Sequence, residues 1–314
     1  MLAFLAGRLV SLLLTLFAAS LVVFVVLRLL PGDPAAIILG VNARPDTIAA
    51  LRQQLGLDRP LWIQFVSWLV GFARGDLGSS YTYNVPVVTL VGERITVSVP
   101  LACLAIVLST AIAIPVGVFA AARRGRAVDT LVMGIAQIGV AIPNFWLALL
   151  LILLFAIRLH WLPASGFAGW EQGVWAGVRS LILPSFALAL PQAAILARVT
   201  RASVLETLSA NFVRTARAKG LSPRAALWRH AVPNALIPVI TIMGLQFSFL
   251  LAGTIIVENV FTLPGLGRLI FQAIAARDLI MVQDLVLLLA GSVVVVNFVV
   301  DLAYAMIDPR LVRS

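Results

Sequence analysis

The sequence predicts an all-α integral membrane protein with six spanning helices, and three observations support this fold class. Of its 314 residues, 61% are hydrophobic and 11% are charged, whereas a typical soluble domain has roughly 25% charged residues. The mean hydropathy is +1.06. Six long stretches contain no Asp, Glu, Lys or Arg, and most are long enough for a helix to cross the hydrocarbon, which takes about 17–25 residues. A soluble fold would need a polar surface that this composition does not supply.

The six spans follow these uncharged stretches in chain order. They are expected at residues 9–30, 97–122, 131–157, 181–198, 234–257 and 284–307. The last stretch reaches spanning length only if Asp301 lies at the membrane boundary. Several stretches contain proline, which is tolerated because neighbouring membrane helices can satisfy the freed backbone groups. The first stretch predicts a retained helix rather than a signal peptide, because no small-x-small cleavage pattern follows it.

The distribution of cations in the short connections predicts the orientation. Three arginines lie within residues 123–129, and seven cations lie within residues 198–229. Short basic loops stay on the cytoplasmic side, whereas long loops translocate largely regardless of charge. Both termini are therefore expected in the cytoplasm, with residues 31–94 as an external loop and residues 198–233 as a cytoplasmic loop. The chain, residues 1–314, is interpreted as a single transmembrane domain, and its +10 net charge is assigned to topology rather than to nucleic-acid binding.

The cytoplasmic loop contains the signals of two short helices, which we call the helix–glycine–helix unit (residues 209–233). Ser209 or Asn211 can cap the first helix. Gly220 can supply the left-handed residue that ends it. Ser222 can cap the second helix, and Pro223 stands at its first position, where proline is favoured. This pattern predicts a compact basic element between two membrane spans.

One face of the first short helix is predicted from residue spacing. Phe212, Ala216 and Lys219 recur at intervals of three and four residues and so share a side of the helix. Basic residues alone would also fit an ordinary positive-inside loop. The capping pattern favours a rigid element that could act as a lever.

The stretch Arg214-Thr-Ala-Arg-Ala-Lys-Gly220, with Pro233 thirteen residues after the glycine, resembles the conserved loop of ABC-importer permease subunits. Arg214 stands where the general consensus has glutamate, and this arginine-first version resembles the dipeptide/oligopeptide/nickel branch. Further matches to the first permease subunit of dipeptide-type importers extend over nearly the whole chain: Pro31-Gly-Asp-Pro34, Leu55-Gly-Leu-Asp58, Gly75-Asp-Leu-Gly78, Leu263-Pro-Gly-Leu-Gly267 and Asp308-Pro-Arg310.

The resemblance implies a type I ABC-importer permease fold in a bacterial or archaeal inner membrane. It also implies a coupling helix that docks in a cleft of the ATP-hydrolysing subunit, formed here by Arg214, Thr215, Ala216, Arg217, Ala218, Lys219 and Gly220. The implied partners are a second, similar permease subunit, two ATP-binding subunits, an external solute-binding protein and membrane lipid. Short peptides are the implied substrate, with glutathione, nickel chelates or oligosaccharides as alternatives.

The chain lacks the sequence signals of an energy-converting or catalytic site. A phosphate-binding P-loop needs Gly-Lys-Ser/Thr, but the single lysine, Lys219, stands between Ala218 and Gly220. We therefore expect ATP and Mg²⁺ to be bound by partner subunits, with no cofactor, metal site or catalytic residue in this chain. His160 and His230 are assigned to opposite sides of the membrane, which argues against an intramembrane enzyme.

An ion-coupled carrier or a channel is the remaining alternative. Such a protein would be expected to place ionisable residues within its spans, and Asp301 is the single candidate at a span edge. Among the polar residues inside the spans, Gln246 and Asn297 are the first candidates for lining a translocation pathway, because they lie in the two spans after the helix–glycine–helix unit. Hydrogen bonding between helices is the alternative role for both.

Overall fold

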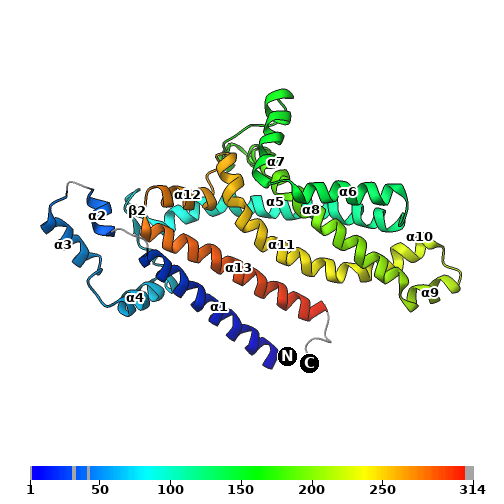
Figure 1. Cartoon of the computed structure of the whole chain (residues 1–314), viewed down its shortest axis with the longest axis horizontal. Helices are drawn as coiled ribbons and strands as arrows, with labels where there is room; N and C mark the ends of the chain where they lie inside the picture. Colours follow the sequence, from blue (N-terminus) through cyan, green and yellow to red (C-terminus); the bar gives the residue numbers. More distant parts are fainter. Residues whose placement is uncertain (1, 30–32, 41–42, 308–314) are drawn as a thin grey trace. The chain divides into compact units, whose positions relative to one another are not determined.

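The computed structural model describes residues 2–29, 33–40 and 43–307, and these residues are mainly helical (Figure 1). Several sequence signals lie outside the described residues. These are Pro31, Gly32, the Asp308-Pro-Arg310 motif and the tail cation Arg313.

The chain divides into two compact units. Unit 1 comprises Met1–Val97 and Gly265–Val295, and unit 2 comprises Ser98–Pro264 and Val296–Ser314. Helices α5 (Val87–Ala122) and α13 (Leu279–Ile307) each continue from one unit into the other.

Unit 1 contains the first helix and the polar segment that follows it. Its elements are α1 (Leu2–Leu29), α2 (Pro34–Leu39), α3 (Pro45–Gln54), α4 (Leu61–Ala73), the short antiparallel pair β1 (Ser79–Ser80) and β2 (Val85–Pro86), the start of α5, α12 (Leu266–Ala275) and the start of α13. The amphipathic stretches of the 31–94 segment thus form helices α3 and α4. Asp33 caps α2 by accepting a hydrogen bond from the Ala35 amide at 3.1 Å, with Pro34 at the first helical position.

The core of unit 1 lies where α12 packs against the beginnings of α5 and α13. Val87, Leu269 and Met281 are each at most 1% exposed there. This burial explains why α5 begins at Val87 rather than at residue 97, where the uncharged stretch predicts the second span. The final eight residues of the expected 31–94 loop belong to this helix.

A polar cluster joins the β1–β2 hairpin to α13, and we call it the hairpin latch (Ser80, Tyr81, Thr82 and Asp278). Asp278 is fully buried, and its carboxylate accepts from Ser80 Oγ at 2.6 Å and from the Thr82 amide at 3.2 Å. It also accepts from the Met281 amide at 3.2 Å and so caps α13. The Tyr81 hydroxyl accepts from the Leu279 amide at 2.7 Å, and burial raises the pKa of this phenol above its ordinary value. The latch therefore satisfies the first amides of α13 with side chains from the hairpin.

Unit 2 contains the remaining helices. They are the rest of α5, α6 (Ala127–Ala141), α7 (Asn144–Leu151) with its π-helical continuation Ile152–Arg158, the 3-10 turn Trp170–Gln172, α8 (Val174–Ser209), α9 (Asn211–Ala218), α10 (Pro223–Ala226), the π-helical turn Leu227–Ala231, α11 (Val232–Val260) and the end of α13. Helix α8 packs extensively on α11 and on α6.

Helices α5 and α8 touch at the level of the backbone beside Gly117. A Cβ atom placed on this glycine would lie 2.6 Å from the Ala197 carbonyl oxygen and 2.6 Å from Thr200 Cβ. No side chain larger than hydrogen fits in this contact without a shift of one helix. Gly117 therefore lets the two helices approach closely.

Among the described residues, five helices are long and apolar enough to cross a membrane, and a sixth span results if α6 and α7 are counted together. The structure differs from the expected helix over residues 131–157, because α6 and α7 are bent by 103° (Figure 1). The break follows from Pro143, which disfavours helical backbone at the residue before it. Ile142 accordingly has extended torsion angles, φ −78° and ψ 123°.

Candidate functional site

The first half of the helix–glycine–helix unit is α9, whose C-terminus is closed by Gly220. Gly220 has φ +95°, a conformation that is cheap only without a Cβ. Its amide donates to the Arg217 carbonyl at 3.0 Å, and the Leu221 amide donates to the Ala216 carbonyl at 3.3 Å. This is the bonding pattern of a Schellman motif. The predicted left-handed end of the helix is confirmed.

The second half begins with the predicted cap. Ser222 Oγ accepts from the Ala225 amide at 3.3 Å, and Pro223 occupies the first position of α10. The chain then continues through the π-helical turn into α11. Both signals that predict the second short helix are confirmed.

The predicted cap of the first short helix is wrong. The N-cap of α9 is Ala210, with extended torsion angles and no side-chain hydrogen bond. Ser209 Oγ instead donates to the Glu206 carbonyl at 2.7 Å, within the last turn of α8, and Asn211 is already helical. The reason is that α8 extends to Ser209, far beyond the expected end of the span at residue 198, so a one-residue break separates two helices.

The exposed surface of α9 includes cations of the predicted coupling helix. Arg214, Arg217 and Lys219 are exposed, and Phe212 is 47% exposed although it is a large apolar residue. Val213, by contrast, is fully buried. The helix thus exposes a large aromatic side chain and three cations while Val213 anchors it to the rest of unit 2.

The C-terminal part of the helix–glycine–helix unit packs into an apolar cluster. Val204 from α8, Leu227 and Ala231 from the π-helical turn, and Val118 from α5 are each at most 8% exposed in this cluster. A movement of α9 and α10 would therefore be transmitted to three long helices through close packing.

A buried ion pair near the end of α8 was not predicted from the sequence. Arg201 on α8 donates to both carboxylate oxygens of Asp129 on α6, at 2.6 and 2.7 Å, and the Asp129 side chain is 6% exposed. The Gly125 amide donates to the same carboxylate at 3.1 Å. Bidentate pairing fixes geometry as well as charge. Nothing local in the sequence pairs these residues, which are 72 positions apart.

The two pathway candidates take part in separate contacts between helices. Gln246 is 4% exposed, and its Nε2 donates to the Gln192 carbonyl of α8 at 3.1 Å, while no described residue partners its buried Oε1. Asn297 on α13 accepts from Ser248 Oγ on α11 at 2.9 Å. Both residues therefore bridge helices, and the structure does not join them into one polar cluster. Among the described residues, no group of three His, Cys, Asp or Glu is placed to hold a metal ion.

The chain is similar to known transport proteins over nearly its whole length. The family described as "Binding-protein-dependent transport system inner membrane component" matches residues 113–313, and its N-terminal counterpart matches residues 1–102. A probable peptide ABC transporter permease protein of Sinorhizobium fredii is 41% identical over 304 residues, with 97% of each chain covered. A putative peptide transport system permease protein of Brucella abortus is 43% identical over 292 residues, with 93% of each covered. The glutathione transport system permease protein GsiC of Escherichia coli is 41% identical over 311 residues, with 99% of each covered. Among solved structures, a crystal structure of an amino acid ABC transporter with histidines gives a TM-score of 0.49 at 17% identity, covering 71% of this chain and 94% of that one.

Proposed function

Because the chain belongs to the family of binding-protein-dependent transport system inner membrane components, and is a multi-pass permease subunit of an ABC importer, we propose that it forms half of a translocation pathway for short peptides. A second, similar permease subunit forms the other half. Two ATP-binding subunits dock from the cytoplasm, and a solute-binding protein delivers the peptide from outside.

The observation that carries the proposal is the shape of the helix–glycine–helix unit. Its first helix ends in a fixed Schellman motif and presents exposed Arg217, Lys219 and Phe212. Aromatic and arginine side chains are enriched at protein–protein contacts. We assign residues Arg214–Gly220 as the surface that docks on an ATP-binding subunit.

The energy source is assigned to the partners because the chain has no phosphate-binding loop around its single lysine. ATP binding would close the ATP-binding subunits and displace α9. Close packing then biases the membrane helices between inward-open and outward-open states, as a ligand biases any two-state element for which it has differential affinity. Hydrolysis resets the assembly. The chain itself performs no catalysis and holds no cofactor in this scheme.

Peptides are favoured as substrates because two of the relatives above are named as peptide permeases. The glutathione permease leaves that tripeptide as a second candidate. Nickel chelates and oligosaccharides stay alternatives from the family resemblance alone.

The transport proposal is tested with purified four-subunit complex in proteoliposomes. We expect uptake of a labelled dipeptide that requires ATP, the ATP-binding subunits and the solute-binding protein. Uptake that persists without the ATP-binding subunits and follows an ion gradient would instead establish an ion-coupled carrier.

The proposed orientation, with both termini and residues 198–233 in the cytoplasm, has its own test. Ser79 and Ser209 are both exposed, so a single cysteine at either position, in a Cys103→Ala background, is open to an impermeant thiol reagent. In intact cells, or spheroplasts if an outer membrane is present, Ser79→Cys should label and Ser209→Cys should not. Labelling of Ser209→Cys from outside would overturn the orientation.

A further inference from the structure

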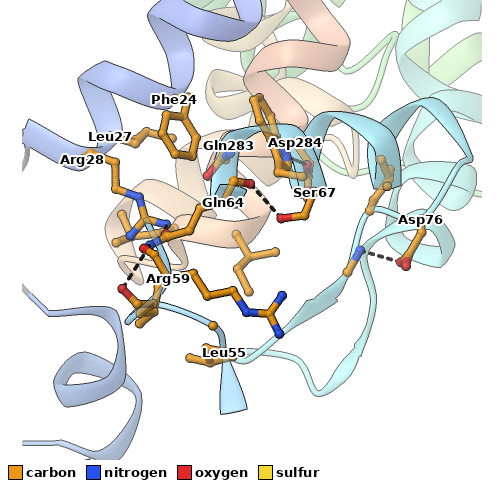
Figure 2. Close-up of a pocket in the computed structure, with 18 of the residues that line it drawn as sticks. Phe24, Leu27, Arg28, Leu55, Arg59, Gln64, Ser67, Asp76, Gln283 and Asp284 are labelled. Atoms are coloured by element: carbon orange, nitrogen blue, oxygen red, sulfur yellow. Dashed lines mark hydrogen bonds between the residues drawn. The ribbon is translucent and has the colours of Figure 1, made fainter. Parts of the chain in front are cut away.

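Unit 1 contains a cavity, lined by both polar and apolar residues, that the transport proposal does not use. Its volume is about 390 Å³, within the range of roughly 300–1,000 Å³ in which small-molecule sites fall. It is lined by the end of α1, by α4, by the segments around Leu57 and Leu77, and by the first turns of α13 (Figure 2). All these segments belong to unit 1.

A buried amide builds the cationic side of this cavity. Gln64 is 9% exposed, and its Nε2 donates to the Leu57 carbonyl at 3.0 Å and to the Arg59 carbonyl at 2.7 Å. Its Oε1 accepts from the Arg28 guanidinium. One glutamine therefore holds both the Arg28 side chain and the segment that carries Arg59 at the same side of the cavity. The Arg28 guanidinium also lies 5.4 Å from the Phe24 ring centre, within cation–π range.

Carboxyl groups line the other side. Asp284 on α13 is 2% exposed and accepts from Trp68 Nε1 at 2.7 Å through Oδ1. Asp76 accepts from the Gly78 amide at 3.1 Å. Figure 2 shows Arg28 and Asp76 at opposite sides of the cavity, with Asp284 between them. A carboxylate has about four acceptor positions, so these bonds leave capacity for a donor from a ligand.

Phe24 and Trp68 also line the cavity, and aromatic contacts hold both rings. Trp68 stacks on Phe24 with ring centres 6.1 Å apart, and Phe65 lies edge-on to Phe24 at 5.3 Å. Such pairs fix side-chain positions beyond what burial alone provides. These contacts therefore hold in place the Trp68 ring that donates to Asp284.

We propose that this cavity binds a small zwitterion, with an anionic group at Arg28 and Arg59 and a primary ammonium at Asp284 and Asp76. A cavity with cations on one side and carboxyls on the other matches a ligand that carries both charges. Two sources share this chemistry: a free short peptide, and the headgroup of an ethanolamine phospholipid. Occupancy of the cavity can be measured without transport.

The first experiment measures binding of labelled dialanine to the assembled complex in detergent, without ATP or solute-binding protein. We expect saturable binding that N-acetylation or C-terminal amidation of the dipeptide weakens by about tenfold each, because each removes one charge-assisted contact. Asp284→Asn, which retains an acceptor for Trp68, and Arg59→Gln, on an exposed side chain, should each raise Kd by about tenfold. Arg44→Gln is the matched control, because Arg44 pairs with Asp46 on the exposed side of α3 and should leave Kd unchanged.

The second experiment tests the lipid source. The complex is equilibrated with vesicles of equal phosphatidylethanolamine and phosphatidylcholine, extracted, and its retained lipid is measured. Retention of phosphatidylethanolamine over phosphatidylcholine that Asp284→Asn and Arg59→Gln abolish identifies the headgroup as the ligand. The proposal is overturned if neither dialanine nor phosphatidylethanolamine is preferred over its neutralised or methylated counterpart, or if the preference survives in both variants.

Discussion

The helix–glycine–helix unit and the hairpin latch both set where a helix starts or stops, but they do so by different means. In the first, the bonds at Gly220 and Ser222 join groups three to five residues apart. In the second, Asp278 accepts from Ser80, which is 198 residues away in the chain. The first is controlled by the conformation of the backbone and the second by individual side chains. Each should therefore respond to a different kind of substitution.

The largest expected effect is that of Gly220→Val. A β-branched residue at φ +95° costs about 1–2 kcal/mol or more, and relief of the strain would redirect α9 relative to α8. We expect loss of ATP-driven uptake in proteoliposomes and reduced co-purification of the ATP-binding subunits.

The matched control for this substitution is Gly166→Val. Gly166 also has positive φ, +82°, and open space where a Cβ would lie, so the substitution introduces similar strain outside the helix–glycine–helix unit. A second comparison is Arg217→Gln, which removes an exposed charge worth under about 1 kcal/mol and should reduce uptake less than about fivefold. Normal uptake by Gly220→Val would contradict the role of this unit as a lever.

The next largest effect is expected from Asp278→Ala in the hairpin latch. The substitution leaves the Ser80 hydroxyl and two amides without their acceptor in a fully buried position. Each unpaired buried group costs about 1–3 kcal/mol, so we expect a loss of about 3 kcal/mol, measured by thermal unfolding of the detergent-purified complex. Asp278→Asn retains an acceptor and should lose about 1 kcal/mol. Equal loss from both variants would show that the charge, and not the bonding geometry, is what the latch requires.

The Asp129–Arg201 pair shares a feature with each of the two regions. Like the hairpin latch, it joins residues that are distant in the sequence, and Arg201 lies on α8, the helix that leads into the helix–glycine–helix unit. Removing one partner of a fully buried pair costs about 3–5 kcal/mol. Since the Arg201 side chain is 27% exposed, we expect about 2 kcal/mol from Arg201→Gln. The reversed pair Asp129→Arg with Arg201→Asp should recover part of the loss. If the double variant is no better than the sum of the single ones, the pair contributes no specific coupling.

The smallest effects on stability are expected from Gln246→Leu and Asn297→Leu. Hydrogen bonds between membrane helices average about 0.6 kcal/mol, so the complex should still assemble. If the residues also line the pathway, as predicted from the sequence, uptake kinetics will change although stability is nearly unaffected. Unchanged kinetics in both variants would leave helix bridging as their role.

Local features of this fold could be predicted from the sequence, and distant ones could not. The left-handed Gly220 and the Ser222–Pro223 cap are determined by neighbours within a few residues, so their residue types predicted them. The pre-proline rule also applies at Ile142, but neighbouring helices can absorb a proline kink in a membrane, so Pro143 alone did not distinguish a kink from the 103° break.

Residues that act over long distances gave no such signal. In the sequence, Asp129 is one charge in a basic loop, and Asp284 borders an uncharged stretch. Their roles depend on Arg201 and Trp68, which lie 72 and 216 positions away. The prediction of the α9 cap was wrong for a related reason. Helix α8 extends to Ser209 and α9 begins at Asn211, so both polar residues that could have capped α9 lie inside helices.

The contact at Gly117 has a mechanical consequence. The Cα atom of Gly117 lies directly against the Ala197 carbonyl and Thr200 Cβ of α8. At this point no side chain lies between the helices that could change rotamer to absorb a displacement. Sliding one helix along the other would bring Ala113 or Ala121, which lie one turn away on the same face of α5, into the space that a hydrogen atom now fills, whereas rotation about the contact keeps it intact. The contact at Gly117 therefore favours a change in the crossing angle of α5 and α8 over a translation of one helix along the other.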